Sequence, residues 1–240
     1  MGRLRSIRHQ NGVISMSHGS SSSAAPTRQP KTSFGGLRSI KASIRGDLYL
    51  AQLLVEHGAN AVAQDRAGLT PLHYASRQGD LDVVRFLVEH GANAAAQSED
   101  GSTPLHQASE RGDLDVVRFL VDHGANAAAQ DEDGWTPLHQ ASQRGDLDIA
   151  QFLVEHGANA AAQDQDGSTP LHQASQRGDL YLARFLVEHG ANAAAQNQEG
   201  STPLHQAAQR GHLDLARFLV EHGTKAATQA TPQILQSPAT

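Results

Sequence analysis

The chain has 240 residues, a formal net charge of −6, no cysteine and 4% aromatic residues. Without cysteine the chain forms neither disulfides nor thiolate metal sites. The lack of cysteine favours a reducing compartment. We therefore expect the cytoplasm, with the nucleus as an alternative. Residues 1–46 hold eight basic and no acidic residues, which leaves 11 basic against 25 acidic residues in the remainder. An acidic body argues against nucleic acid as the main ligand, because phosphates would be repelled.

Residues 1–31 are rich in serine, glycine and arginine and contain the stretch HGSSSSAAPTRQP. Such a segment buries too little apolar surface to offset its ordering entropy, so we predict a disordered basic tail. Two targeting interpretations stay open. The first residues, MGRLRS, fit the pattern of N-myristoylation, although a basic residue directly after Gly2 weighs against it. The Arg- and Ser-rich, acid-free composition also fits a mitochondrial transit peptide.

From about residue 32 onwards, two motifs recur every 33 residues. The histidine of Thr-Pro-Leu-His stands at His73, His106, His139, His172 and His205. The glycine of a His-Gly pair stands at Gly58, Gly91, Gly124, Gly157, Gly190 and Gly223. Two markers in constant phase indicate stacked copies of one unit. We expect units at 32–64, 65–97, 98–130, 131–163, 164–196 and 197–229, followed by a tail at 230–240.

The unit 131–163 shows how the first half of each copy is expected to fold. Gly134 follows Asp133 and supplies the positive φ of a turn. Thr136 is a good N-cap, and Pro137 stands at the first helical position, where its missing N–H costs nothing. A short helix follows and ends at Gly145.

The second half of the unit predicts a second helix. Asp146 caps its start, and His156-Gly157 ends it. Residues 158–163 are expected to be an extended link to the next turn. An apolar stripe runs along this helix at helical spacing, made of Leu147, Ala150, Leu153 and Val154. Each unit thus exposes apolar surface on both sides, which only neighbouring units bury.

This pattern resembles the ankyrin repeat, whose period and TPLH mark it shares over about residues 32–229. The resemblance implies a mainly α ankyrin-repeat solenoid of helix–turn–helix units with β-hairpin tips. It also implies that the threonine and histidine of TPLH bond each other and the backbone. In the first unit, Arg38-Ser39-Ile40 stands where Pro-Leu-His would be, so we interpret residues 32–64 as a degenerate N-terminal cap with a polar outer face.

Three kinds of chemistry compete with this structural interpretation. His139, Ser142 and Asp146 have the residue types of a hydrolase, but the trio recurs in copy after copy and lacks a strained nucleophile turn. The 14 histidines fall mainly into two columns whose members lie too far apart to share a metal. The acidic turns lack the later ligands of a calcium loop. We therefore expect no enzyme activity, no cofactor and no metal.

The resemblance implies a non-catalytic scaffold that binds another protein through the tips and the concave face of the first helices. If a partner binds there, it should offer basic groups to the acidic tips and acidic or amide groups to the arginines at the ends of the first helices. The alternative is a spacer, or a fragment of a larger ankyrin protein with no ligand of its own. The candidate binding residues are Leu69, Tyr74, Arg77, Glu110, Arg111, Trp135, Gln140, Arg144, Gln173, Arg177 and Arg210.

Two further expectations concern Trp135 and the C-terminal end. Trp135 is the only tryptophan, and its place in a tip predicts a solvent-exposed indole. The last unit keeps the apolar set of the interior copies, and only Ile234-Leu235 in the tail could cover it. We expect a monomer whose C-terminal unit is the least stable, with weak end-to-end association as a further outcome.

Overall fold

The computed structural model describes residues 47–229, with side chains up to Gly223. The predicted tail at 1–31, the start of the N-terminal cap at 32–46 and the tail at 230–240 lie outside the described residues. Within the described part, helices alternate between two kinds. The first helices are α3 (Pro71–Gln78), α5 (Pro104–Arg111), α7 (Pro137–Arg144), α9 (Pro170–Arg177) and α11 (Pro203–Gln209). The second helices are α2 (Leu48–Glu56), α4 (Leu81–Glu89), α6 (Leu114–Asp122), α8 (Leu147–Glu155), α10 (Leu180–Glu188) and α12 (Leu213–Gln229).

The first helices α3, α5, α7 and α9 begin and end where the sequence predicts. In α7, Thr136 is the N-cap and its hydroxyl accepts a hydrogen bond from the His139 backbone N–H at 3.3 Å. Pro137 occupies the first turn, where no N–H is needed. Gly145 ends the helix in the left-handed conformation, at φ 74°. A cap of this kind turns the chain sharply, so that α8 can fold back beside α7.

The second helices from α2 to α10 start after an aspartate N-cap and end at a histidine C-cap. The Asp146 carboxylate accepts a hydrogen bond from the Ile149 backbone N–H, and His156 forms the C-cap of α8. The link after it contains a turn, because the Asn159 side chain accepts the Ala161 N–H at 2.9 Å and the Asn159 carbonyl accepts the Ala162 N–H at 3.1 Å. The expectation of an extended link was therefore wrong, since an asparagine side chain stabilises a local turn.

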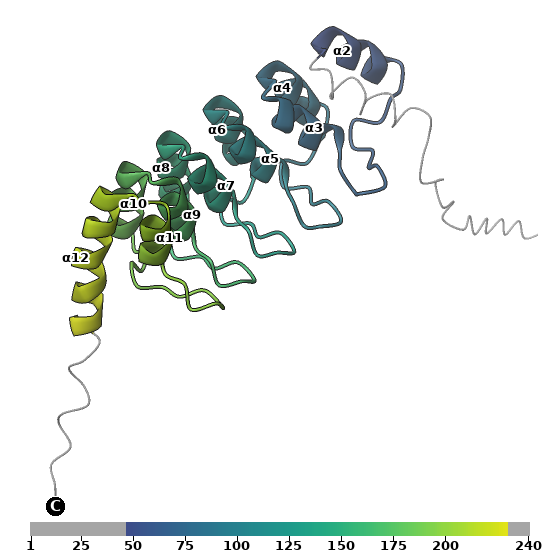
Figure 1. The fold of residues 1–240 in the computed structure, drawn as a ribbon. Coiled ribbons are helices and arrows are strands. Elements are labelled where there is room, and N and C mark those ends of the chain that lie inside the picture. Colours follow the sequence, from purple (N-terminus) through teal and green to yellow (C-terminus); the bar gives the residue numbers. More distant parts are fainter. Residues whose placement is uncertain (1–46, 230–240) are drawn as a thin grey trace, which may run out of the picture. The chain divides into compact units, whose positions relative to one another are not determined.

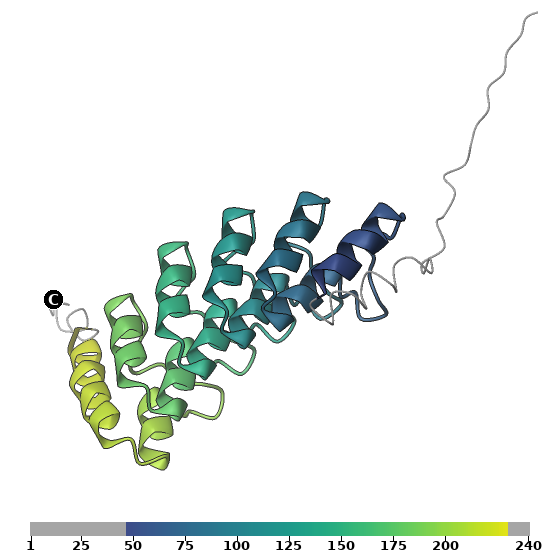
Figure 2. The ribbon, with the colours of Figure 1, turned by 90° about the horizontal axis from the view of Figure 1, so that it is seen from above.

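The units stack in order, with each first helix against the next first helix and each second helix against the next second helix. This gives two layers of helices, and the tips of all units project on the same side (Figure 1). Seen from above, the second helices α2 to α12 form one row (Figure 2). The core between the layers consists of small and aliphatic side chains such as Leu138, Ala141, Ile149 and Leu153, all fully buried. Small residues let the two layers approach closely.

The tips contain no β-strand in any of the described residues, so the expected β-hairpins are not confirmed. The tip at 131–135 is a turn in which the Asp131 N–H donates to the Trp135 carbonyl at 3.0 Å. In return, the Trp135 N–H donates to the Asp131 side chain at 2.9 Å. A side-chain carboxylate thus supplies the acceptor that a second strand residue would supply in a hairpin.

The last unit departs from the pattern at its second helix. The interior helix α8 ends at Glu155, but α12 runs through Gly223 and continues to Gln229. Gly157 has φ 95° and interrupts the helix, whereas Gly223 is helical. Gly223 thus keeps the 33-residue spacing of the His-Gly pairs but does not end its helix. In this unit Thr224-Lys225 replaces Ala-Asn, so the asparagine that forms the turn after the interior helices is missing.

Candidate interaction surface

The tips form a continuous hydrogen-bonded row. The Glu132 N–H donates to the Asp100 carbonyl of the preceding tip, and the Gln165 N–H donates to the Asp133 carbonyl, each at 2.8 Å. The same bond joins Glu99 to Ala67 and Gln198 to Asp166. A side chain on Gly134 would lie 3.0 Å from the Cα of Asp164, so glycine permits the close approach as well as the positive φ of 79°. The tips therefore hold each other in place along the array.

Each interior TPLH histidine links its own unit to the next one. The Thr136 backbone N–H donates to Nδ1 of His139 at 3.2 Å, so Nδ1 carries no proton. The opposite nitrogen, Nε2, is then the N–H donor, and it bonds the Ser168 carbonyl in the next tip at 3.3 Å. The equivalent contacts join His73 to Ser102, His106 to Trp135 and His172 to Ser201.

These histidines are held neutral by burial. Desolvation lowers the pKa of His139 to about 4, and it also lowers the pKa values of His73, His106 and His172. Both nitrogens of each ring are occupied by backbone groups, so these rings have no free nitrogen for a metal or a substrate. The hydroxyls of Ser76, Ser109, Ser142 and Ser175 are buried without a hydrogen-bond partner. A nucleophile activated by a neighbouring histidine would require such a bond.

Two of the candidate arginines at the ends of the first helices have a structural role that the sequence did not reveal. The Arg144 guanidinium lies against Gly112 of the preceding unit, and its NH1 group donates to the Glu110 carbonyl at 3.2 Å. Arg177 lies against Gly145 in the same manner. The Arg144 cation satisfies a carbonyl at the C-terminal end of α5, which is the negative end of that helix. Arg111, Arg144 and Arg177 are nevertheless exposed, as are Arg77, Glu110 and Arg210.

The other candidate residues are partly buried. The Tyr74 hydroxyl donates to the Asp65 carboxylate at 2.6 Å, which raises the pKa of Tyr74 to about 12. Gln140, Gln173 and Leu69 are also partly buried and keep only part of their surface open. Trp135 is partly buried too, because its ring lies 5.6 Å from that of His139. The solvent exposure expected for the indole is therefore only partial.

Comparison with known families agrees with this geometry. A family model described as "Ankyrin repeats (3 copies)" matches residues 91–164 and 156–230, and one described as "Ankyrin repeats (many copies)" matches residues 54–105. The chain belongs to the ankyrin repeat family. No curated protein matches the chain in sequence. Ankyrin repeats are generally protein–protein interaction modules and are typically non-catalytic.

The ankyrin array has a second set of regularly spaced histidines, on its second helices. In each of the second helices from α4 to α12, Nδ1 of the histidine bonds the carbonyl of a phenylalanine four residues earlier, and the two rings pack together. These histidines therefore help to end or pack the helices. Among residues 47–229, no group of three or more potential ligands could hold a metal ion. No helix in that range has the length and hydropathy that a bilayer crossing requires.

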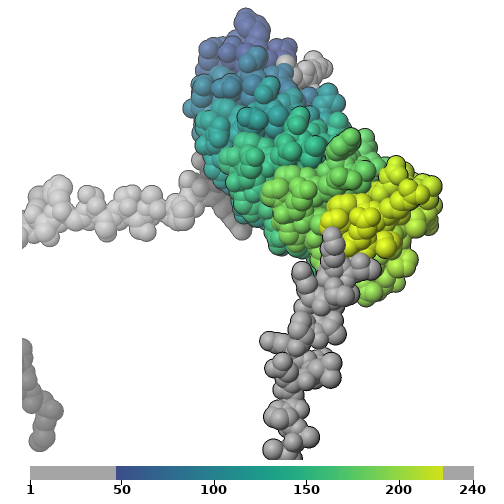
Figure 3. Space-filling view, turned by 90° about the vertical axis from the view of Figure 1, so that its left-hand side faces the viewer, coloured from purple at the N-terminus to yellow at the C-terminus, as the bar shows by residue number. Residues whose placement is uncertain are grey.

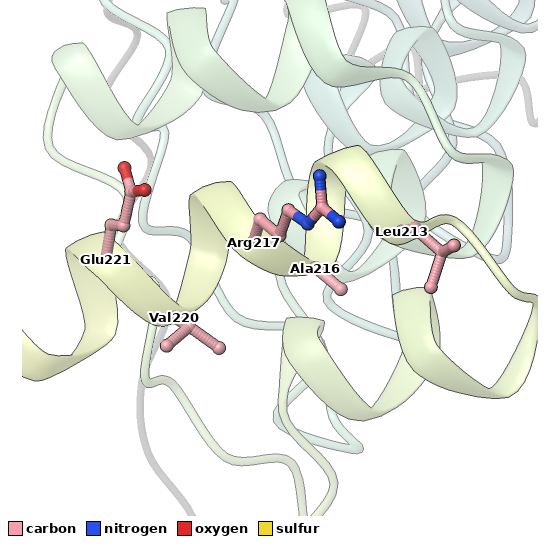
Figure 4. Close-up of a pocket in the computed structure, with 5 residues that line it drawn as sticks. All are labelled: Leu213, Ala216, Arg217, Val220 and Glu221. Carbon is pink, nitrogen blue, oxygen red and sulfur yellow. The ribbon is translucent and has the colours of Figure 1, made fainter.

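The ankyrin array ends on a shallow apolar surface along α12. It is lined by Leu213, Ala216, Arg217, Val220 and Glu221 (Figure 4). Leu213 is 70% exposed, whereas the equivalent Leu147 in α8 is partly buried under the next unit. In the space-filling view, α12 lies at this end of the array (Figure 3). The apolar character of this end was predicted from the residues that the last unit shares with the interior copies.

Proposed function

We propose that this ankyrin array is a non-catalytic scaffold that binds another protein through the tips and the adjoining first-helix surface. The observation that carries the proposal is the row of hydrogen bonds between successive tips. A surface that is already ordered loses little conformational entropy when a partner binds, which favours affinity. Large loops that had to order on binding would forfeit this advantage.

The charges of this surface indicate the chemistry of the partner. The tips carry exposed carboxylates at Glu99, Asp100, Glu132, Asp133 and Asp166. Exposed arginines stand at the ends of the first helices, and one of them, Arg144, is hydrogen-bonded to the preceding unit. A partner that presents basic groups to the tips and acidic or amide groups to the arginines would match both rows. The cytoplasmic location expected from the cysteine-free sequence belongs to the same proposal.

Site-specific photo-crosslinking of the full chain in living cells tests the proposal. A photoreactive amino acid replaces Trp135 in a tip or Gln140 on the first-helix surface. The matched control places it at Asp115, an exposed position on the outer side of α6. We expect a discrete cross-linked protein from the first two positions and none from Asp115. Cross-links only from Asp115, or from none of the three positions, would contradict the proposed binding surface.

A substitution at Trp135 then asks whether the contact carries binding energy. Serine stands at this position in the copies of Ser102, Ser168 and Ser201, so Trp135→Ser is compatible with the fold. A partly exposed aromatic ring in an interface centre is worth about 2 kcal/mol or more. We expect the variant to weaken the cross-link at Gln140 while thermal unfolding stays cooperative. An unchanged cross-link would place the interface away from this tip.

A further inference from the structure

The outer side of the array carries a ladder of arginines stacked on phenylalanines. The Arg85 guanidinium carbon lies 4.9 Å from the ring centre of Phe119 in the next unit, and Arg118 lies 5.2 Å from Phe152. Arg184 lies 5.4 Å from Phe218. A guanidinium at this distance over a ring is attracted by the negative face of the ring. The ladder thus shows which chemical group this phenylalanine position accepts.

The ladder is interrupted at Phe185. The residue that would reach it, in the equivalent position of α8, is Gln151 instead of arginine. Among the described residues, no guanidinium or ammonium group lies over the Phe185 ring. The rings of Phe119 and Phe152 are each only 8% exposed, whereas Phe185 is partly buried, as is Phe218, which Arg184 covers.

A second departure from the repeat lies on the same helix face. Tyr181 stands four residues before Phe185, where four other copies have aspartate at Asp82, Asp115, Asp148 and Asp214. Residues four apart on a helix are neighbours on one face. Tyr181 is 77% exposed, so its ring meets solvent instead of the core. On the other side of Phe185, the His189 ring packs at 4.1 Å between centres.

The two departures both change the surroundings of Phe185. One removes the arginine that would cover the ring, and the other replaces a carboxylate with a second aromatic face. The exposed Asp148 and Asp214 stand in the position of Tyr181 on the neighbouring helices α8 and α12, which pack on either side of α10. This leaves an open aromatic surface with a carboxylate on each flank, of which Asp214 lies 3.9 Å from the Arg217 guanidinium. Both features favour a cation, and a planar guanidinium stacks better than an ammonium.

We propose that Tyr181, Phe185 and Gln151 form a second interaction site, which receives an arginine side chain of a partner protein. The partner's guanidinium occupies the place over Phe185 that an intramolecular arginine occupies over Phe119 and Phe152. This site lies on the second helices, apart from the tips and the first-helix surface, so it does not rest on the function proposed above.

The test is a nuclear magnetic resonance titration of the full chain with labelled phenylalanine and tyrosine rings. The probe is a tri-arginine peptide, and its tri-citrulline analogue is the neutral control of the same shape. We expect tri-arginine to shift the ring signals of Phe185 and Tyr181 more than those of Phe119 and Phe152, which are already covered. Tri-citrulline should leave all four rings unchanged.

Two charge-matched variants decide whether the open ring is the cause. Gln151→Arg restores the arginine of the sister copies and is expected to weaken the peptide's effect at Phe185 about threefold or more. Gln176→Arg adds the same charge on a first helix, at the position that Arg77 occupies in another copy, and should change little. Tyr181→Asp restores the usual residue and should also weaken the effect.

The outcomes that would overturn the proposal are equally definite. Equal shifts at all phenylalanine rings would show general attraction of a basic peptide to an acidic protein. An equal loss in Gln151→Arg and Gln176→Arg would show the same. The absence of any shift at Phe185 with tri-arginine would show that the ring accepts no external guanidinium.

Discussion

The interior unit 131–163 and the terminal unit 197–229 have nearly the same sequence but different surroundings. His139 is fully buried and bonds the next tip, whereas His205 is exposed in the last described unit. Leu147 is partly covered, whereas Leu213 is 70% exposed. The same side chain is therefore a core residue or a surface residue according to whether a unit follows it. Stability in this array belongs to the interfaces between units.

Replacing the two histidines with alanine is expected to give the largest contrast. His139→Ala removes a buried ring and leaves the Thr136 N–H and the Ser168 carbonyl without partners, so it should cost about 3 kcal/mol or more. His205→Ala removes an exposed ring and should cost about 1 kcal/mol or less. Urea unfolding of the two variants measures the difference. Equal losses would mean that the link to the next tip contributes nothing.

Acid should weaken the interior interfaces. The folded pKa of His139, about 4, lies below its ordinary value of 6.5, so the unfolded chain takes up the proton first as the pH falls. The contribution of the neutral His139 ring to the free energy of unfolding is fully present above about pH 6.5. This contribution should fall by about 3 kcal/mol as the pH falls to about 4. Urea midpoints at pH 7, 5 and 4 check this. A midpoint that is constant over this range would contradict the neutral, buried state of the ring.

Hydrogen exchange should show the difference between the two units directly. The terminal unit is packed on one side only, so its amides should open without unfolding the rest of the array. We expect residues 197–222 to exchange about tenfold faster or more than residues 131–163. Equal protection would show that α12 or the residues after it cap the end fully. The apolar surface of Leu213, Ala216 and Val220 would then be covered in solution.

The smallest expected effect is at the serine that follows the TPLH motif. The Ser142 hydroxyl is buried without a partner, and the equivalent residue in the terminal unit is Ala208. Ser142→Ala removes an unpaired polar group, so stability should stay the same or rise by up to about 1 kcal/mol. Thermal unfolding beside Ser109→Ala, a second copy of the same change, measures it. A loss above about 1 kcal/mol would reveal a hydrogen bond to this hydroxyl.

Local rules were enough to predict most of the helices from the sequence. Thr136, Pro137, Gly145 and Asp146 each act through backbone groups within four residues, and all of them perform the predicted role. The tips were less predictable, because an aspartate side chain closes a turn where a paired strand was expected. The length of α12 was also missed. At the usual helix end the His-Gly pair is followed by Ala-Asn, and that Ala-Asn is replaced only in the last unit.

The candidate site was predictable in its location and less so in its details. Comparing equivalent positions in the copies identified the tips and the exposed arginines. The hydrogen bond between Arg144 and the preceding unit joins residues 34 apart in sequence, so no local rule predicts it. Burial of Trp135 against His139 likewise depends on how the tip folds onto its helix. The arginine–phenylalanine ladder has the period of the repeat, so a comparison of copies could have found it, including the break at Gln151.

The row of bonds between tips has a direction: each tip donates an N–H to the one before it and offers a carbonyl to the one after it. The four junctions between Ala67 and Gln198 thus use the same donor and acceptor positions. A whole unit can be gained or lost by recombination between copies, and the junction that results is equivalent to those already present. A crossover out of register would instead separate a histidine from the carbonyl it bonds. The near-identity of the copies in amino-acid sequence therefore lets the array change its length without a new kind of interface.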